Sequence, residues 1–236
     1  MKTRLLEIRQ GVLSKNDELA EGLRQRFTQA GVMTFNVVSS PGAGKTTFLE
    51  KTIRMLAERG YQVAVLVGDL ETDNDAQRLA AAGMPVKQIQ TAGNCHLEAQ
   101  MIHNFIADWD LNHIDFLFIE NVGNLVCPSS YDLGEALRIV LLSTTEGEDK
   151  PLKYPPMFNS SDVAVVTKID LAEAVEFDRE AALQSLNQVH PGIPIFEVSA
   201  KKGTGMDEWL DALIQRYEDW RIAAMTDTTA PILTNP

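Results

Sequence analysis

Residues 37–47 read Val-Val-Ser-Ser-Pro-Gly-Ala-Gly-Lys-Thr-Thr, and this stretch decides the fold that the sequence predicts. An apolar strand leads into a loop of small residues, then Gly-Lys-Thr, then a helix, which is the pattern of a phosphate-binding P-loop. The first glycine of the G-x-x-x-x-G-K-T pattern is Ser39 here. The alternative is an ordinary strand-to-helix turn that binds no ligand. Such a turn would not need Lys45 followed by Thr46, so the presence of this pair favours a P-loop.

The residues expected to bind phosphates follow one another in this loop. Glycines let backbone N–H groups turn inward at the positive end of a helix, where a polyphosphate is stabilised. Lys45 is expected between the β- and γ-phosphates, and the hydroxyl of Thr46 is expected on Mg²⁺. The predicted phosphate-binding set is Gly42, Ala43, Gly44, Lys45, Thr46 and Thr47.

Apolar runs that alternate with helical patterns predict a mostly parallel sheet with helices on both faces, an α/β P-loop NTPase fold. Buried strands are indicated at 34–38, 62–67, 85–89, 115–119, 162–167 and 195–198. Helices are indicated at 1–28, with a cap-like break at 14–17, and at 47–60, 75–82 and 96–109.

Composition narrows the classes of partner. The chain has 236 residues, enough for one well-cored domain. Its 21 Lys and Arg against 33 Asp and Glu give a net charge of −12, which argues against nucleic acid and against an anionic membrane surface. No apolar run has transmembrane length, and the first residues do not resemble a signal peptide. We therefore expect a cytoplasmic protein whose two cysteines are reduced.

Two short motifs at predicted strand ends indicate that the base is guanine. Residues 167–170 read Thr-Lys-Ile-Asp and resemble the [NT]-K-x-D element of GTPases. Asp170 can accept the paired N1–H and N2 amino donors of guanine, and adenine lacks that pair. Lys168 is expected to lay its methylene stem across the base. Farther on, the backbone N–H groups of Ser199, Ala200 and Lys201 are expected at the guanine O6.

Acidic groups at two other strand ends are candidates for Mg²⁺ binding and hydrolysis. Asp69 and Asp75 lie in a switch-like acidic loop, for which a solvated helix start is the alternative. Glu120 opens Glu-Asn-Val-Gly, in the place of a D-x-x-G element, and Gly123 is expected to donate its N–H to the γ-phosphate. No Gln stands where a small GTPase orients water, so we expect slow hydrolysis that depends on positioning and charge.

Both cysteines lie near these switch segments. Cys95 and His96 are expected at a helix N-terminus, where a thiolate is stabilised, and Cys127 lies four residues beyond Gly123. Two thiols and an imidazole suit Ni²⁺ or Zn²⁺; buried thiols beside a surface histidine are the alternative. Three ligands fall short of a closed zinc site, so a two-fold dimer is expected to bring two sets together.

Together the motifs resemble the hydrogenase nickel-incorporation GTPases of the HypB type. The resemblance rests on residues 39–46, 68–73, 94–97, 120–128 and 167–170, and it extends over about 30–215. The specific part is the Cys-His pair with Glu-Asn-Val-Gly-Asn-Leu-Val-Cys-Pro. It implies a SIMIBI-like GTPase that dimerises with GTP, holds metal at the two cysteines and the histidine, and helps to load nickel into the [NiFe]-hydrogenase large subunit precursor.

The resemblance also implies a small nickel- and zinc-binding partner of the HypA type. It suggests that Lys153 or Lys150 reaches the nucleotide of the other subunit, although surface lysines are the alternative. Residues 1–31 carry neither a Cys-x-x-Cys-Gly-Cys segment nor a His-rich stretch, so tight nickel storage is not expected. We expect a helical segment at 1–30, the GTPase domain with the metal site at 31–222 and a loose tail at 223–236.

Three alternatives remain. A urease nickel GTPase is a sister type, but that type places Cys-Pro-His where Cys95 and His96 are contiguous here. A metal-binding regulator that nucleotide merely stabilises would not need the phosphate-sensing Gly123. A signalling GTPase with inert thiols is the third alternative, and it predicts that Cys127→Ser changes nothing.

Overall fold

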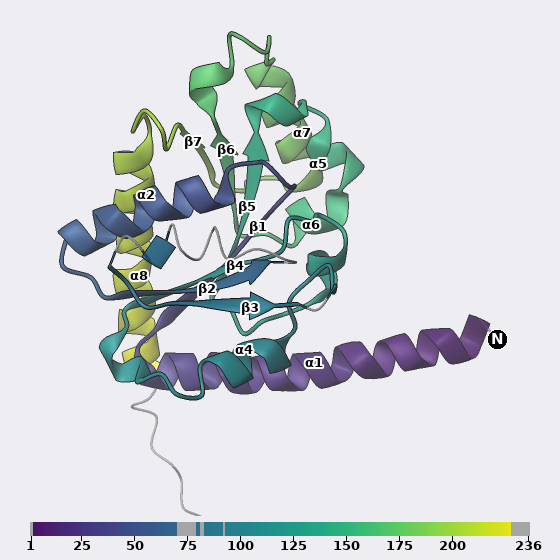
Figure 1. The fold of residues 1–236 in the computed structure, drawn as a ribbon. Helices are drawn as coiled ribbons and strands as arrows, with labels where there is room; N and C mark the ends of the chain where they lie inside the picture. Colours follow the sequence, from purple (N-terminus) through teal and green to yellow (C-terminus); the bar gives the residue numbers. More distant parts are fainter. Residues whose placement is uncertain (1, 70–78, 81–82, 92, 228–236) are drawn as a thin grey trace, which may run out of the picture.

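Seven parallel strands form one sheet in the order β3-β2-β4-β1-β5-β6-β7 (Figure 1). This computed structural model describes residues 2–69, 79–80, 83–91 and 93–227, with side chains over 11–68, 79–80, 83–91 and 93–224. The strands are β1 (Met33–Ser39), β2 (Val63–Asp69), β3 (Val86–Gln90), β4 (Phe116–Glu120), β5 (Leu137–Ser143), β6 (Val163–Thr167) and β7 (Ile195–Val198). Because neighbouring strands are parallel, their carboxyl ends lie along one edge, where the loops that follow them meet.

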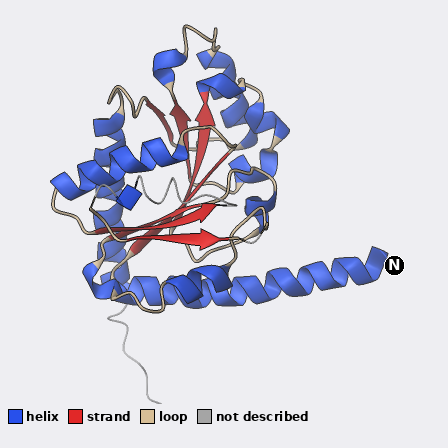
Figure 2. Ribbon diagram, viewed as in Figure 1, coloured by secondary structure: helices blue, strands red, loops and turns tan. Residues whose placement is uncertain are grey.

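Helices cover both faces of this sheet (Figure 2), as expected. One face packs against α2 (Lys45–Glu58) and α8 (Met206–Asp227). On the other face, α1 (Lys2–Ala30) and α4 (Ala99–Phe105) cover β2 and β4, while α6 (Pro155–Asn159) and α7 (Arg179–Val189) cover β5 and β6. The short helices are α5 (Lys150–Lys153), η1 (Leu111–His113), η2 (Cys127–Ser130), η3 (Thr144–Glu146) and η4 (Ile169–Leu171).

The central strands read as continuous apolar runs because both of their faces are covered. β1 and β4 are buried at every residue, as parallel strands between two helical layers should be. Phe48 of α2 packs on Trp209 of α8 with ring centroids 5.3 Å apart, and the Trp209 indole donates to the Thr52 hydroxyl. Burial of each large apolar side chain contributes about 1.5–3 kcal/mol. The helix that starts at the phosphate loop is therefore held firmly against the sheet.

The strand β5 is missing from the sequence prediction, although Leu137-Arg138-Ile139-Val140-Leu141-Leu142-Ser143 is mostly apolar. A charged residue inside the run conceals it. Arg138 is buried there because it pairs with Glu135 at 2.8 Å, a partner that no sequence pattern identifies. The helices α7 and α8 were also not predicted.

Two predicted helices differ from the structure, and so does the expected end of the domain. α1 runs without a break through 14–17. The Asn16 side chain bonds other elements instead: its Nδ2 donates to the Asp132 carbonyl, and its Oδ1 accepts from the Ala99 N–H. α4 begins at Ala99 rather than His96. α8 continues to Asp227, past the expected boundary at 222. Most of the helix expected at 75–82 lies outside the described residues.

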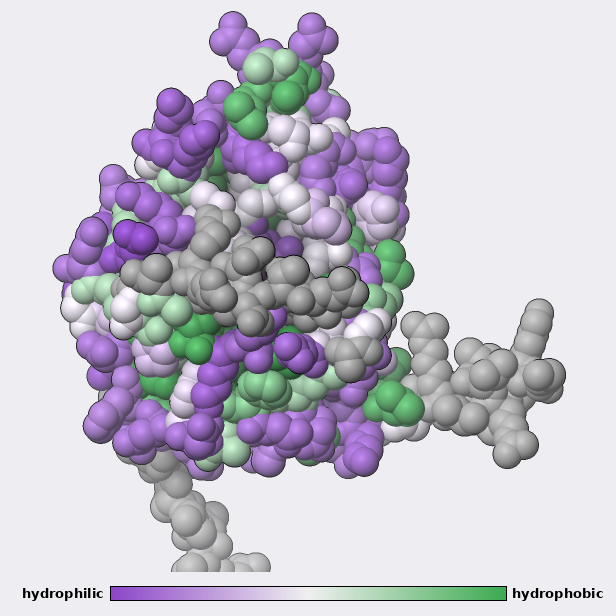
Figure 3. Space-filling view, viewed as in Figure 1, coloured by the Kyte–Doolittle hydropathy of each residue, from purple (hydrophilic) through white to green (hydrophobic). Residues whose placement is uncertain are grey.

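The visible surface is mainly hydrophilic, with apolar residues in small separate groups (Figure 3). Among the helices in the described ranges, none combines the length and the apolar character that crossing a lipid bilayer requires.

Candidate functional site

The loop between β1 and α2 is held in shape by its own polar side chains. The Lys45 ammonium donates to the Ser39 hydroxyl at 3.0 Å, and that hydroxyl in turn donates to the Ser40 carbonyl. Lys45 and Thr46 are both nearly buried, and they open α2, so the backbone N–H groups of its first turn point toward the loop. The serine at the first glycine position of the motif therefore orients the lysine.

Glu120, the last residue of β4, reaches the start of α2. Its Oε1 accepts a hydrogen bond of 2.8 Å from the Thr46 hydroxyl, and the carboxylate is 3% exposed. A buried carboxylate beside the P-loop hydroxyl is a fitting donor set for Mg²⁺, which prefers hard oxygen ligands. The structure thus brings Glu120 and Thr46 together, and their role in Mg²⁺ binding remains a prediction. The backbone of Asp69 ends β2, but its side chain and the whole of Asp75 lie outside the described residues.

Gly123 lies against the phosphate loop, where a larger residue does not fit. A Cβ at this position would meet the Pro41 Cα at 3.1 Å and the Pro41 ring at 3.2 Å. The segment that follows β4 therefore approaches the loop through the one residue that lacks a side chain. This contact places the Gly123 backbone beside the phosphate loop, and its role toward a γ-phosphate remains a prediction.

The guanine motifs converge on one pocket of about 280 Å³ beside the phosphate loop. It is lined by Ala43, Gly44, Thr47, Phe48, Thr167, Lys168, Asp170, Leu171, Val198, Ser199, Ala200 and Lys201. The Asp170 carboxylate accepts a hydrogen bond of 2.6 Å from the Ser199 hydroxyl. The structure therefore brings together the two motifs that sequence reasoning placed at the ends of β6 and β7. Phe48 and Leu171 complete the pocket and were not predicted.

Thr167 and Lys168 fasten the end of β6 to the phosphate loop. The Thr167 hydroxyl donates to the Ala43 carbonyl at 2.7 Å, and the Lys168 ammonium donates to the Gly42 carbonyl at 2.6 Å. Lys168 adopts a left-handed backbone, with φ of 59°, and its carbonyl accepts from the Thr144 hydroxyl. The Thr167 hydroxyl thus braces the end of β6 against the phosphate loop.

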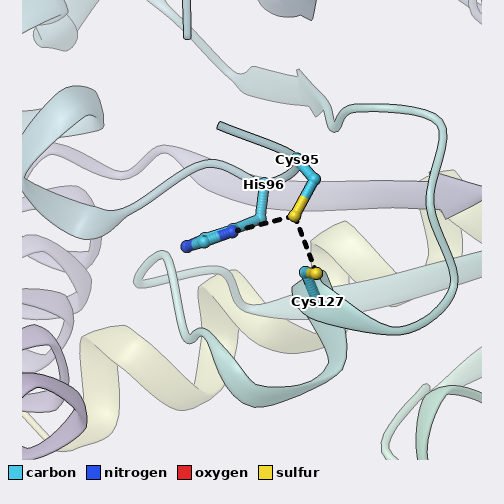
Figure 4. Close-up of side chains that lie close together, drawn as sticks. All are labelled: Cys95, His96 and Cys127. Carbon is cyan, nitrogen blue, oxygen red and sulfur yellow. Dashed lines mark hydrogen bonds between the residues drawn. The ribbon is translucent and has the colours of Figure 1, made fainter. Parts of the chain in front are cut away.

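Cys95, His96 and Cys127 form one cluster (Figure 4). The two sulfur atoms lie 2.7 Å apart, the His96 Nδ1 lies 3.7 Å from the Cys95 Sγ, and one ligand atom from each residue lies within 4.8 Å of the others. Cys95 is exposed and Cys127 is half-buried. Two thiols and an imidazole that converge from separate loops fit a soft or borderline cation such as Ni²⁺ or Zn²⁺.

The His96 ring is fixed from two sides. It stacks on Tyr131 with ring centroids 3.9 Å apart, and its Nε2 faces the Glu98 Oε1 at 3.4 Å. The orientation leaves Nδ1 on the side of the thiols. Neither Tyr131 nor Glu98 was predicted, since nothing in the sequence distinguishes them from surface residues.

The expectation that Cys95 stands at a helix N-terminus is wrong. Glu98 precedes the first residue of α4, and Cys95 lies in a turn before it. That turn is held by hydrogen bonds to the segment after β4, from the Asn124 amide to the Cys95 carbonyl and from the Leu97 N–H to Asn121. The hydrogen bond to Cys127, followed by desolvation, raises the pKa of the Cys95 thiol above its ordinary value.

Leu97 packs its side chain onto the backbone of β2. A Cβ at Gly68 would lie 2.8 Å from a Leu97 methyl group, so the strand leaves out a side chain to admit this leucine. The thiol-bearing turn is therefore seated on β2, the strand that precedes the acidic residues of 69–75 in the sequence.

The lysines expected to act across a dimer lie on the surface. Lys153 is 61% exposed and pairs with Asp149 at 2.7 Å, while the Lys150 ammonium lies 3.8 Å from Glu146 and near the Tyr154 ring. Neither residue lines the base pocket. Their role toward a second nucleotide remains a prediction.

Comparison with known proteins agrees with these features. Residues 33–197 match the family model described as CobW/HypB/UreG, nucleotide-binding domain. The hydrogenase maturation factor HypB of Azotobacter vinelandii is 47% identical over 226 residues, which cover 96% of this chain and 74% of that protein. The hydrogenase/urease maturation factor HypB of Helicobacter hepaticus is 44% identical, with 89% of this chain and 88% of that protein covered.

A solved structure resembles the fold closely. The crystal structure of HypB from Helicobacter pylori in complex with nickel superposes with a TM-score of 0.82 and 41% identity, covering 87% of this chain and 96% of that one. With the phosphate loop, the base pocket and the thiol–imidazole cluster in place, the chain belongs to the HypB hydrogenase maturation factors of the CobW/HypB/UreG family.

Proposed function

We propose that this protein binds and hydrolyses GTP and uses its nucleotide state to control nickel delivery during hydrogenase maturation. One observation carries the proposal: residues 120–127 begin at the phosphate loop and end at the thiols. Glu120 bonds Thr46, and Cys127 contacts Cys95. If residues 120–127 moved when the γ-phosphate is lost, the movement would affect both the nucleotide site and the thiol–imidazole cluster, because this segment contributes residues to each.

The base pocket supports GTP as the nucleotide. Its carboxylate, Asp170, is held by Ser199, and guanine offers it a pair of donors that adenine lacks. Mg²⁺ would be held by Thr46 with Glu120 nearby, and the charge that it supplies would offset the negative charge of the β- and γ-phosphates. GTP hydrolysis is expected to be slow, because the sequence analysis identifies no glutamine in the position that orients the attacking water in small GTPases.

Nickel is the cargo that fits the cluster and that a relative's structure contains. Zinc suits the same ligands. Because one chain offers three ligands, we propose that GTP favours a homodimer in which two clusters face one another. A HypA-type protein and the hydrogenase large subunit precursor are the proposed donor and recipient of the metal. Delivery to urease is a second candidate, because the Helicobacter hepaticus relative is named for both roles.

The decisive experiment is a Ni²⁺ titration of the protein with GDP and with a non-hydrolysable GTP analogue. We expect the nickel affinity to differ between the two states by roughly 5- to 150-fold, the usual size of coupling between two sites. Cys127→Ala should weaken nickel binding and leave GTP affinity unchanged. Equal nickel affinity in both states would contradict the coupling and leave the cluster a passive holder.

A further inference from the structure

Four polar side chains form a continuous buried network beneath the metal cluster. Asn36, Asn121, Glu135 and Arg138 are exposed by 0%, 1%, 8% and 8%, and we call them the Asn–Arg network. Burial of an ion pair and two amides costs desolvation, and apolar residues of the same volume are often equally stable. Stability alone therefore does not account for these residues.

The Asn–Arg network runs across three adjacent strands. The Asn121 amide donates to the Asn36 Oδ1 at 3.1 Å, and the Asn36 amide donates to the Glu135 Oε1 at 3.0 Å. Arg138 donates to the same carboxylate oxygen through Nε at 3.0 Å and Nη2 at 2.8 Å. Asn36 of β1 lies between β4, which ends next to Asn121, and β5, where it is paired with Arg138.

One end of the network holds the turn that carries Cys95 and His96. The Asn121 Oδ1 accepts from the Leu97 N–H at 3.3 Å and from the Val122 N–H at 2.9 Å. Asn121 also follows Glu120 directly in the chain, so the same residue touches the turn and adjoins the carboxylate that bonds Thr46.

The other end holds the loop that carries Cys127. The Arg138 Nη2 donates to the Tyr131 carbonyl at 2.9 Å, and Nη1 approaches the Ser129 carbonyl at 3.5 Å. Both carbonyls lie within four residues of Cys127, and the ring of Tyr131 stacks on His96. The Cys95–His96 turn and the Cys127 loop are far apart in the sequence, but hydrogen bonds hold them to the two ends of the same network.

We propose that the Asn–Arg network is a positioning device that sets the spacing between the two halves of the metal cluster. Asn36 and Arg138 are positioning residues: neither contacts metal, and both act through the backbone groups that hold the cysteines and the histidine. The inference rests on the proposed function, since it presumes that nickel is the ion bound there. It goes beyond that function in assigning the site's geometry to residues remote from the ligands.

Asn36→Val tests the middle of the network, at a residue that neither lines the base pocket nor belongs to the Cys95–His96–Cys127 cluster. Valine suits a buried strand and removes both amide links. We expect nickel affinity at fixed GDP to fall roughly 10- to 100-fold, the usual loss when partners outside the ligand set are removed. The near-ultraviolet charge-transfer absorption of nickel-bound thiolate should shift. GDP affinity should stay unchanged.

Arg138→Lys is the second variant, in case Asn36→Val does not fold. Lysine keeps the buried charge for Glu135 but cannot also reach the Tyr131 and Ser129 carbonyls with a planar fork. Arg24→Met is the matched control, because it breaks an arginine–carboxylate pair to Asp132 in the same loop and removes none of the hydrogen bonds that join the four network residues. We expect the control to lower thermal stability and to leave nickel affinity and the absorption band unchanged.

The outcomes separate the two proposals. Unchanged nickel affinity and absorption in the folded variants would overturn the positioning role, and so would an equal loss in Arg24→Met. Failure of the proposed function has a different signature: the unaltered protein would bind nickel equally with GDP and with the GTP analogue, whatever the variants do.

Discussion

The hydroxyl of Thr46 donates a hydrogen bond of 2.8 Å to the Oε1 of Glu120, which joins the start of α2 to the end of β4. The D-x-x-G element of GTPases has aspartate at this strand end. Here the residue is Glu120, and its carboxylate reaches the Thr46 hydroxyl directly. The pair therefore marks the place at which the nucleotide site meets the segment that leads to the thiols.

Glu120→Gln should lower GTP hydrolysis on the order of 10²-fold, the size of effect for losing one preorganised electrostatic contact. The amide keeps an acceptor for Thr46 but removes the buried charge. Single-turnover phosphate release measures the effect, and Glu50→Gln, on the exposed side of α2 beside Arg54, is the control. Full activity in Glu120→Gln would rule out a role for the carboxylate.

Asp170→Ala should abolish the preference for guanine. The carboxylate in the base pocket is the group that distinguishes the two bases, so the ratio of GTP to ATP affinity should fall by at least about 10²-fold. Competition binding with both nucleotides measures the ratio. Ser199→Ala, which keeps the carboxylate but removes the hydrogen bonds of the Ser199 hydroxyl to Asp170 and from the Lys202 N–H, should reduce it less. If discrimination against ATP survives in Asp170→Ala, another group reads the base.

Gly123→Ala should impair the response to the γ-phosphate. The added methyl group would meet the Pro41 backbone at 3.1 Å, so the segment after β4 must move away from the phosphate loop. We expect weaker binding of a GTP analogue, with GDP binding nearly unchanged, in paired titrations. Gly22→Ala is the control: it meets nothing within 4 Å on α1 and should stabilise the protein by about 0.5–1 kcal/mol. Equal loss of both nucleotides would mean general damage to the loop.

Asp132→Asn should remove an acid-sensitive part of the stability. Burial alone would raise the pKa of Asp132, but hydrogen bonds from Arg24 and Gly134 outweigh it and hold the pKa below the ordinary 3.8. A lowered pKa in the folded state stabilises above the unfolded value and is lost as the pH falls through the folded value.

The unaltered protein should therefore exceed Asp132→Asn by about 0.5–1 kcal/mol at pH 7, the range for a partly exposed pair. The difference should shrink as the pH falls below 3.8 and vanish once the pH has passed the lower pKa of folded Asp132, because both forms are then neutral at this position. Urea unfolding across this pH range measures it, with Asp219→Asn, exposed on α8, as the control. A difference that stays constant from pH 7 to pH 3 would contradict the ionic origin.

The sequence was sufficient to identify the residues that are expected to contact ligand. Lys45, Asp170 and Gly123 each belong to a short motif in which the residue type follows from the chemistry of phosphate or guanine. Their placement at strand ends followed from the parallel sheet, whose carboxyl ends share one edge. The cluster of Cys95, His96 and Cys127 was predicted as a set because three soft donors lie near two switch segments, and the structure confirms that they converge.

The residues that support the site could not be predicted in this way. Arg138 reads as an interruption of an apolar run, and only its contact with Glu135 explains a charge inside β5. Asn36 lies in a buried strand where its partners are separated from it by many residues in the chain. The spacing of apolar residues along the sequence indicates whether a segment is a helix or a strand. The contacts of Asn36 and Arg138 depend instead on which strands are neighbours in the sheet.

Gly68 has a consequence for the order of events during folding. Because Gly68 has no side chain, Leu97 packs directly against the backbone of β2, and the Leu97 N–H donates to Asn121, which follows β4. The loop that carries Cys127 is held by hydrogen bonds from Arg138 of β5. The cluster therefore forms only after β1, β2, β4 and β5 have paired. We therefore expect that a nascent chain does not bind nickel in this geometry, and that metal ligation during refolding would report when the sheet is complete.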